Sequence, residues 1–391
     1  MNISTAPTFS EPFTGSGDAL TLAGANPSAV SAVHERPFNA IFWEKLTWLR
    51  GCLALYVMLH HVRNSLWPMV RDLGEADRWW KAWNSAMGVA LFFGLDAVLL
   101  FFLVSGLSIH AATLARPKLT FSTPDFYRRR LRRLMPALVA SCLPVGLVYY
   151  FSHGHSIANQ WSNLLGTLTF QQGVLTDSFA ENSPYWSLAN EGYYYFIYPL
   201  LWMAMRRIGN TWAILLFGTA ALALSLSPLG HAGTLAIYYP VWLAGAFLAL
   251  TLQERRNWSN LALAGLIALV VASLATTLSE RLHPALAQPL WHMLSGIALS
   301  GLLYLWLRRL RVDRAPRWIR NVLNTLGEMS YSLYLTHFAA VTAVAYYWPQ
   351  AKQSFLPAAT ASLVAITLSL AMAWILYQTV ERPFSATKRA S

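Results

Sequence analysis

The feature that most constrains this chain is a series of long apolar segments spread along nearly its whole length. A helix that crosses the roughly 30 Å hydrocarbon core of a bilayer needs about 20 residues. Ten segments approach or exceed this length: 46–66, 87–112, 134–151, 187–205, 211–228, 234–252, 259–279, 287–307, 328–348 and 355–379. Only 12% of the residues are charged, against about 25% in soluble domains. We expect an all-α fold: a polytopic integral membrane helix bundle of about ten transmembrane helices.

The basic residues predict how such a bundle is oriented. If successive loops alternate between the two sides, one side carries every lysine and arginine except Arg63, Arg71, Arg78, Lys81, Arg281 and Lys352. Cytoplasmic loops are enriched in these residues. Both termini are therefore expected in the cytoplasm. The formal net charge of +12 reflects topology, and no nucleic-acid partner is expected.

The segments outside the bundle are few. Residues 1–43, rich in Ser, Thr, Ala, Gly and Pro, are typical of a disordered cytoplasmic tail with no cleavable signal peptide. Residues 44–384 form the predicted transmembrane domain, and 385–391 form a short cytoplasmic tail. Two sizeable external loops are expected, at 67–86 and 152–186. The second has no lysine or arginine, which suits a sugar, although an ordinary solvated loop explains it equally well.

An arginine and a histidine stand in the first apolar segment, at Arg50 and His61. On a helix they lie roughly 16 Å apart along the axis, so His61 reaches the middle of the bilayer if Arg50 is at its surface. A neutral imidazole there could accept a hydroxyl proton as a general base. A histidine satisfied within the bundle is the alternative. His60 points about 100° away and is interpreted as structural or supportive.

A carboxylate, Asp96, lies within the otherwise apolar second segment. A buried carboxylate needs a partner, and the imidazole of His61 is the candidate, although Asp96 is expected a turn or two further out. Ser105 and Gly106, further along this segment, are typical of a close helix contact.

Five arginines occupy six positions at 128–133. A topology signal or an anchor to lipid headgroups would account for such a cluster. The functional alternative is a phosphate clamp, because a guanidinium donates two parallel hydrogen bonds.

Aromatic and polar residues alternate at the start of the fourth segment, where Trp186, Glu191 and Tyr194 lie. An interfacial aromatic belt explains the rings, whereas an aromatic ring beside a carboxylate also describes a sugar-binding surface. For His337, in the ninth segment, the sequence allows either a packing role or a substrate-binding role. No metal site is expected, because Cys52 and Cys142 lie in apolar segments and the remaining histidines lack metal-ligand spacing.

Taken in order, these pieces resemble the acyltransferase-3 family of membrane-bound O-acyltransferases. The resemblance covers about 44–384 and rests on six pieces: Arg50 with ten residues to His61, Asp96 through Gly106, Arg129-Arg130-x-x-Arg133-x-x-Pro136, Trp186-Ser187-Leu188 with Glu191, Gly327 through His337, and Glu381-Arg382-Pro383. Two positions depart from the family pattern: Thr47 replaces a common acidic residue, and Cys52 a small or aliphatic one.

The resemblance implies a multi-pass protein of the bacterial cytoplasmic (inner) membrane that moves an acyl group, often acetyl, from cytoplasmic acyl-CoA to a hydroxyl. The acceptor would be a sugar of a surface polysaccharide, a lipid-linked glycan or a glycosylated metabolite. The resemblance carries roles over to the following residues: His61, Asp96 and Glu191 in catalysis, and Arg50, Arg129, Arg130 and Arg133 in binding acyl-CoA.

The sequence thus predicts a membrane O-acyltransferase in which His61 deprotonates the acceptor or is itself acylated. Asp96 or Glu191 would orient the imidazole or hold the sugar, with Trp186, Tyr194 and His337 as further substrate contacts. The alternative is a transporter or flippase for a glycan or lipid-linked sugar, using the same histidine and carboxylates as a proton relay. A non-catalytic scaffold for polysaccharide assembly is a third possibility.

Overall fold

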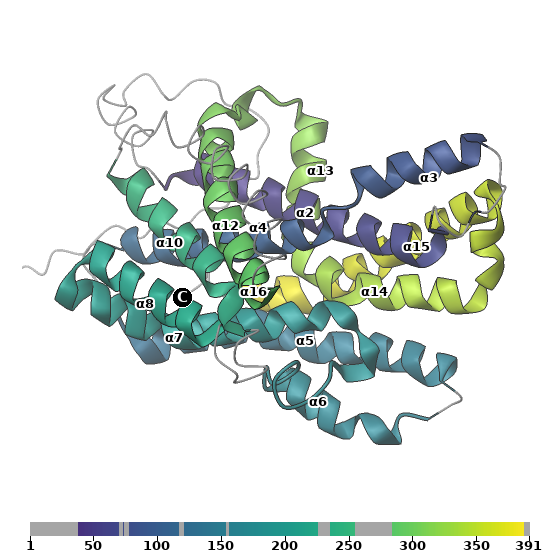
Figure 1. Ribbon diagram of the computed structural model, residues 1–391, viewed down its shortest axis with the longest axis horizontal. Coiled ribbons are helices and arrows are strands. Elements are labelled where there is room, and N and C mark those ends of the chain that lie inside the picture. Colours follow the sequence, from purple (N-terminus) through teal and green to yellow (C-terminus); the bar gives the residue numbers. More distant parts are fainter. Residues whose placement is uncertain are drawn as a thin grey trace, which may run out of the picture.

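The protein is mostly helical in the part of the chain that the computed structural model describes, which comprises residues 38–69, 73, 78–116, 121–153, 156–225, 235–254 and 284–386. Those ranges contain no β-strand, so the all-α prediction is confirmed for them (Figure 1). The main helices are α2 (Ala40–Leu66), α3 (Arg78–Ala90), α4 (Gly94–Leu114), α5 (Thr123–Ser152), α6 (Trp161–Leu168), α7 (Trp186–Ile208), α8 (Asn210–Ser225), α10 (Tyr239–Gln253), α12 (Pro284–Arg309), α13 (Arg317–Glu328), α14 (Ser330–Tyr347) and α15 (Phe355–Leu376). The predicted helix at 259–279 and most of the predicted tails lie outside the described residues.

Several of these helices suit a bilayer. Within the described ranges, four helical stretches are long and apolar enough to cross a membrane: Arg78–Leu114 (α3 and α4 together), Thr123–Ser152 (α5), Leu235–Gln253 (including α10) and Phe355–Phe384 (α15 and the helical residues that follow it). They indicate a membrane protein. The count of ten spans and the cytoplasmic position of both termini stay predictions.

Several element boundaries predicted from the sequence were wrong. Helix α2 begins six residues before the predicted start, and α6 lies within the loop expected at 152–186. The expected loop at 67–86 contains the first part of α3, which ends at Ala90 before α4 begins at Gly94. Helix α5 begins at Thr123, eleven residues before the predicted start. Ser122 caps it by accepting a hydrogen bond from the Asp125 amide over 3.4 Å, and such a cap favours an early start. The arginine cluster therefore lies on a helix, where its members point in different directions.

Helices α4 and α10 touch backbone to backbone at two glycines. A Cβ on Gly106 would lie 2.0 Å from the Trp242 carbonyl oxygen, and one on Gly245 would lie 2.0 Å from that of Leu103. Small residues allow this close approach between membrane helices. The contact predicted at Gly106 is confirmed, and it fixes the part of α4 that carries the polar residues described below.

Replacing Gly106 by alanine should lower stability by about 1–3 kcal/mol or more, because overpacking forces the two backbones apart. The thermal midpoint of the detergent-solubilised protein measures this. The control is Gly218→Ala on α8, where the new Cβ would be 3.9 Å from the Leu243 side chain. Alanine favours a helix over glycine, so this variant should melt at or above the wild-type temperature. Equal midpoints for the two variants would contradict the packing interpretation.

Helix α13 runs across α2 rather than along it (Figure 1). Gly51 and Gly327 meet at this crossing, where an added Cβ on Gly51 would lie 2.6 Å from the Gly327 amide nitrogen. Arg320 donates hydrogen bonds to both carboxylate oxygens of Glu44 over 2.9 Å. Together these contacts hold the first half of α2 and hence place Arg50.

The start of α14 is tied to the end of the chain. Glu381 lies in a π-helical turn (Tyr377–Glu381) that follows α15. Its Oε2 accepts hydrogen bonds from the Ser332 hydroxyl (2.6 Å) and amide (3.2 Å). A carboxylate is favourable at a helix N-terminus. The Glu-Arg-Pro motif therefore helps to position the first turns of α14.

Candidate active site

Five helices, α2, α4, α5, α7 and α14, surround one cavity of about 90 Å³. We call it the central cavity. It is lined by Arg50, Val98, Phe101, Phe102, Ser105, Ser108, Ile109, Arg130, Arg133, Leu134, Ser187, Leu188, Glu191, Tyr195, Ser330, Tyr331 and Tyr334.

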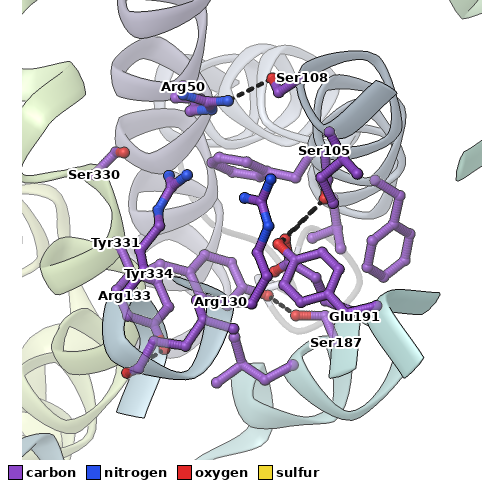
Figure 2. A pocket seen from close by; sticks show the side chains of 17 residues that line it. Arg50, Ser105, Ser108, Arg130, Arg133, Ser187, Glu191, Ser330, Tyr331 and Tyr334 are labelled. Carbon is purple, nitrogen blue, oxygen red and sulfur yellow. Dashed lines mark hydrogen bonds between the residues drawn. The ribbon is translucent and has the colours of Figure 1, made fainter. Parts of the chain in front are cut away.

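Three arginines reach the central cavity from two helices. Figure 2 shows the guanidinium groups of Arg130 and Arg133 directed toward Arg50. Arg50 donates a hydrogen bond to the Ser108 hydroxyl over 2.5 Å. The guanidinium of Arg130 lies over the Tyr195 ring, 5.4 Å from its centroid, within the range of a cation–π interaction. This arrangement suits an anionic group such as a phosphate.

Glu191 is the one acidic residue among those that line the central cavity. Its Oε1 accepts a hydrogen bond from the Ser105 hydroxyl over 2.9 Å and another from the Tyr195 hydroxyl. These bonds fix the carboxylate on the α7 wall of the cavity (Figure 2). One carboxylate against three guanidinium groups leaves the cavity positively charged.

His61 and His337 pack together beyond the Tyr334 end of the cavity. The ring centroid of His337 is 5.9 Å from that of Tyr334 and 5.3 Å from that of His61. The Nδ1 atom of His337 lies 3.0 Å from the Leu333 carbonyl oxygen, to which it can donate, while its Nε2 is buried with no hydrogen-bond partner among the described residues. Among the described residues, neither ring nitrogen of His61 has a hydrogen-bond partner. Neither His61 nor His337 is among the residues that line the central cavity.

The neighbouring His60 has a different environment. Its Nδ1 lies 2.6 Å from the Leu91 carbonyl oxygen, and its Nε2 lies 2.9 Å from the side-chain nitrogen of Asn64. The ring also abuts Gly94, where an added Cβ would lie 2.5 Å from it. His60 therefore secures the start of α4, a structural role.

Asp96 lies in the first turn of α4 and is half-buried. In the described part of the chain its carboxylate makes no hydrogen bond or ion pair with His61. The hydrogen bond expected between them is absent from this structure. A catalytic role for Asp96 stays a prediction.

Arg129 does not reach the central cavity, although Arg130 and Arg133 do. Consecutive helical residues point about 100° apart, so the predicted clamp is divided between two places. Arg129 lines a second cavity, which we call the end cavity. Its lining residues are Thr113, Leu114, Arg116, Phe121, Ser122, Thr123, Asp125, Arg129, Trp202, Met203, Arg206, Arg207 and Gln253.

Trp186 and Tyr194 lie behind the central cavity and do not line it. Both rings pack against Phe102, which does, at centroid distances of 6.2 and 5.5 Å. Tyr194 is buried, and its hydroxyl donates to the Leu235 carbonyl over 3.1 Å. In this structure the two residues support the cavity wall, and direct substrate contact stays a prediction.

Sequence reasoning missed several polar residues of the site, namely Ser108, Tyr195, Tyr331 and Tyr334. One available signal was spacing. Ser330, Tyr334 and His337 recur at helical intervals and share a face of α14. Ser105 and Ser108 repeat the pattern on α4.

Comparison with known proteins identifies the family. The acyltransferase-3 family model, described as an acyltransferase domain, matches residues 43–378. The chain therefore belongs to this family of acyltransferases, and the resemblance drawn from its motifs is confirmed.

A curated protein of Haemophilus influenzae, described as uncharacterized, is 29% identical over 117 residues. The matched part covers 26% of this chain and 46%, about half, of that relative. No solved structure matches the chain.

Proposed function

We propose that the protein transfers an acyl group, acetyl in the typical case, from cytoplasmic acyl-CoA to a sugar hydroxyl of a glycoconjugate at the bacterial cytoplasmic membrane. The observation that carries this proposal is the convergence of Arg50, Arg130 and Arg133 on one cavity whose Tyr334 contacts His337, the ring neighbour of His61. The guanidinium groups would bind the CoA phosphates by charge-assisted hydrogen bonds. The thioester would extend past Tyr334 toward His61.

In the proposed reaction the acceptor hydroxyl oxygen attacks the thioester carbonyl carbon. A carbon–oxygen bond forms and the carbon–sulfur bond breaks. His61 takes the hydroxyl proton and delivers it to the departing CoA thiolate. In the covalent variant, His61 first displaces the thiolate and then passes the acyl group to the hydroxyl. The ring nitrogens of His61, which have no hydrogen-bond partner in the described part of the chain, support both routes.

Residues near His61 and the arginines would assist the same acyl transfer. His337, in ring contact with His61, would orient the imidazole. Glu191, held by Ser105 and Tyr195, would fix Tyr195 and thereby Arg130. Asp96, Trp186 and Tyr194 remain candidates for holding the acceptor sugar.

Purified protein in lipid nanodiscs, given acetyl-CoA with a labelled acetyl group, should release free CoA and labelled product. With no acceptor present, slow hydrolysis of the donor is expected. A transporter or a scaffold would leave acetyl-CoA intact, and that outcome would refute the proposal. Mass spectrometry of surface glycans and glycosylated metabolites, from cells with and without the chain, then identifies the acceptor.

A further inference from the structure

The end cavity is larger than the central cavity and remains outside the mechanism above. It has a volume of about 760 Å³ and lies where α4 and α7 end and α5 begins. Its size and composition suit a substantial ligand.

The walls of the end cavity carry an excess of positive charge. Arg116, Arg129, Arg206 and Arg207 contribute four guanidinium groups, against the single carboxylate of Asp125. That carboxylate already accepts a hydrogen bond from Arg128 over 2.9 Å. None of the four lining arginines forms an ion pair with a carboxylate of the described residues. Like charges gathered around one cavity repel, so an anion bound there would relieve the repulsion.

An aromatic wall accompanies this charge. The rings of Phe121 and Trp202 both line the cavity, with centroids 5.7 Å apart and planes 33° apart. Tyr198 and His110 pack behind them at centroid distances of 5.9 Å. A supported aromatic surface offers a stacking platform for a flat base, and stacked bases recur where proteins bind nucleotides. An isolated phosphate or a lipid headgroup would leave this surface unused.

The end cavity and the central cavity occupy neighbouring positions along two helices. On α4, Ile109 lines the central cavity and Thr113 the end cavity, about 6 Å apart along the axis. On α5, Arg129 and Arg130 are consecutive and line the end and central cavities respectively. The arginines of the two cavities are therefore close enough along α5 for one long ligand with several phosphates to reach both sets.

We propose that the end cavity binds the adenosine 3′,5′-bisphosphate end of the acyl-CoA donor, an inference that rests on the proposed function. Arg116, Arg129, Arg206 and Arg207 surround the 3′-phosphate, and the adenine stacks on Phe121 and Trp202. The diphosphate then leads past Arg130 into the central cavity. Specificity for CoA over shorter thioesters is located in this end cavity.

Direct binding tests the proposal without relying on turnover. The full-length wild-type protein in nanodiscs of neutral lipid is titrated with adenosine 3′,5′-bisphosphate by calorimetry. Binding is expected, and it should be competed by CoA and only weakly by inorganic phosphate. The Arg206→Gln/Arg207→Gln variant should bind the bisphosphate at least roughly tenfold more weakly, since hydrogen bonds to charged groups are the strong ones. Absence of wild-type binding would overturn the proposal.

Kinetics with two donors supply the second readout. The double variant should raise KM for acetyl-CoA at least roughly tenfold while leaving KM for acetyl-pantetheine, which lacks the nucleotide, unchanged. The matched control is Arg132→Gln, an exposed arginine of α5 that lines neither cavity; its KM for acetyl-CoA should equal that of wild type.

The remaining outcomes are distinguishable. If the double variant loses affinity for vesicles containing anionic lipid but keeps that for the bisphosphate, the cavity is a headgroup site and the proposal is wrong. If both donors are used equally well by all variants, the nucleotide assignment fails and the acyltransferase function stands. If the wild type binds the bisphosphate yet transfers from neither donor, the proposed function fails instead.

Discussion

Replacing His61 by alanine should lower kcat for acyl transfer by about 10²–10⁴-fold, the usual contribution of a general acid–base group. If His61 is the acylated group, turnover should fall further. Loss of the ring removes contacts with His337 and Phe338 and no hydrogen bond to the described residues. The variant should therefore accumulate in the membrane and bind acetyl-CoA as the wild type does. Initial rates at saturating donor, normalised to folded protein, measure the effect.

His60→Ala is the matched control, because it removes the same side chain one position earlier. It breaks the bonds to Leu91 and Asn64, so the thermal midpoint should fall while the rate per folded molecule stays close to wild type. Transfer by His61→Ala at the wild-type rate would remove His61 from the mechanism. A greater loss of kcat in His60→Ala would reverse the two roles.

Replacing Arg130 by methionine should raise KM for acyl-CoA by roughly 10- to 100-fold, since a hydrogen bond to a charged group contributes about 1.5–3 kcal/mol. Methionine fills much of the same space without the charge. The expected change is in KM more than in kcat, because phosphate contacts far from the thioester are equally present in the ground and transition states. Steady-state kinetics over a range of acetyl-CoA concentrations separate the two parameters.

Arg132→Met removes the same charge two residues along α5, from an exposed position outside both cavities. Its KM should not change. If instead both variants alter only the amount or the orientation of protein in the membrane, the arginine cluster is a topology signal. That result would favour the alternative that the sequence left open.

The sequence pointed to several residues of the candidate site because their signals are local. The ten-residue interval between Arg50 and His61, and the spacing of Arg130 and Arg133, are short-range patterns set by helical geometry. Both patterns lie on single helices in the structure, the first on α2 and the second on α5. Whether Asp96 and His61 form a hydrogen bond was not predictable in this way, because it depends on how α4 is rotated and shifted against α2.

By itself, the sequence predicted an all-α membrane protein of the acyltransferase-3 family, and the family is confirmed. Apolar segment length and motif order follow from local chemistry, since each helix satisfies its own backbone hydrogen bonds in lipid. Only the tertiary structure showed that Arg129 and Arg130 line different cavities. It also showed that His60 has hydrogen-bond partners among the described residues, whereas His61 has none. It also placed Tyr334 between the arginines and the histidines. Those outcomes depend on contacts between helices far apart in the chain, such as Gly106 against Trp242, where backbone approach sets which side chains meet.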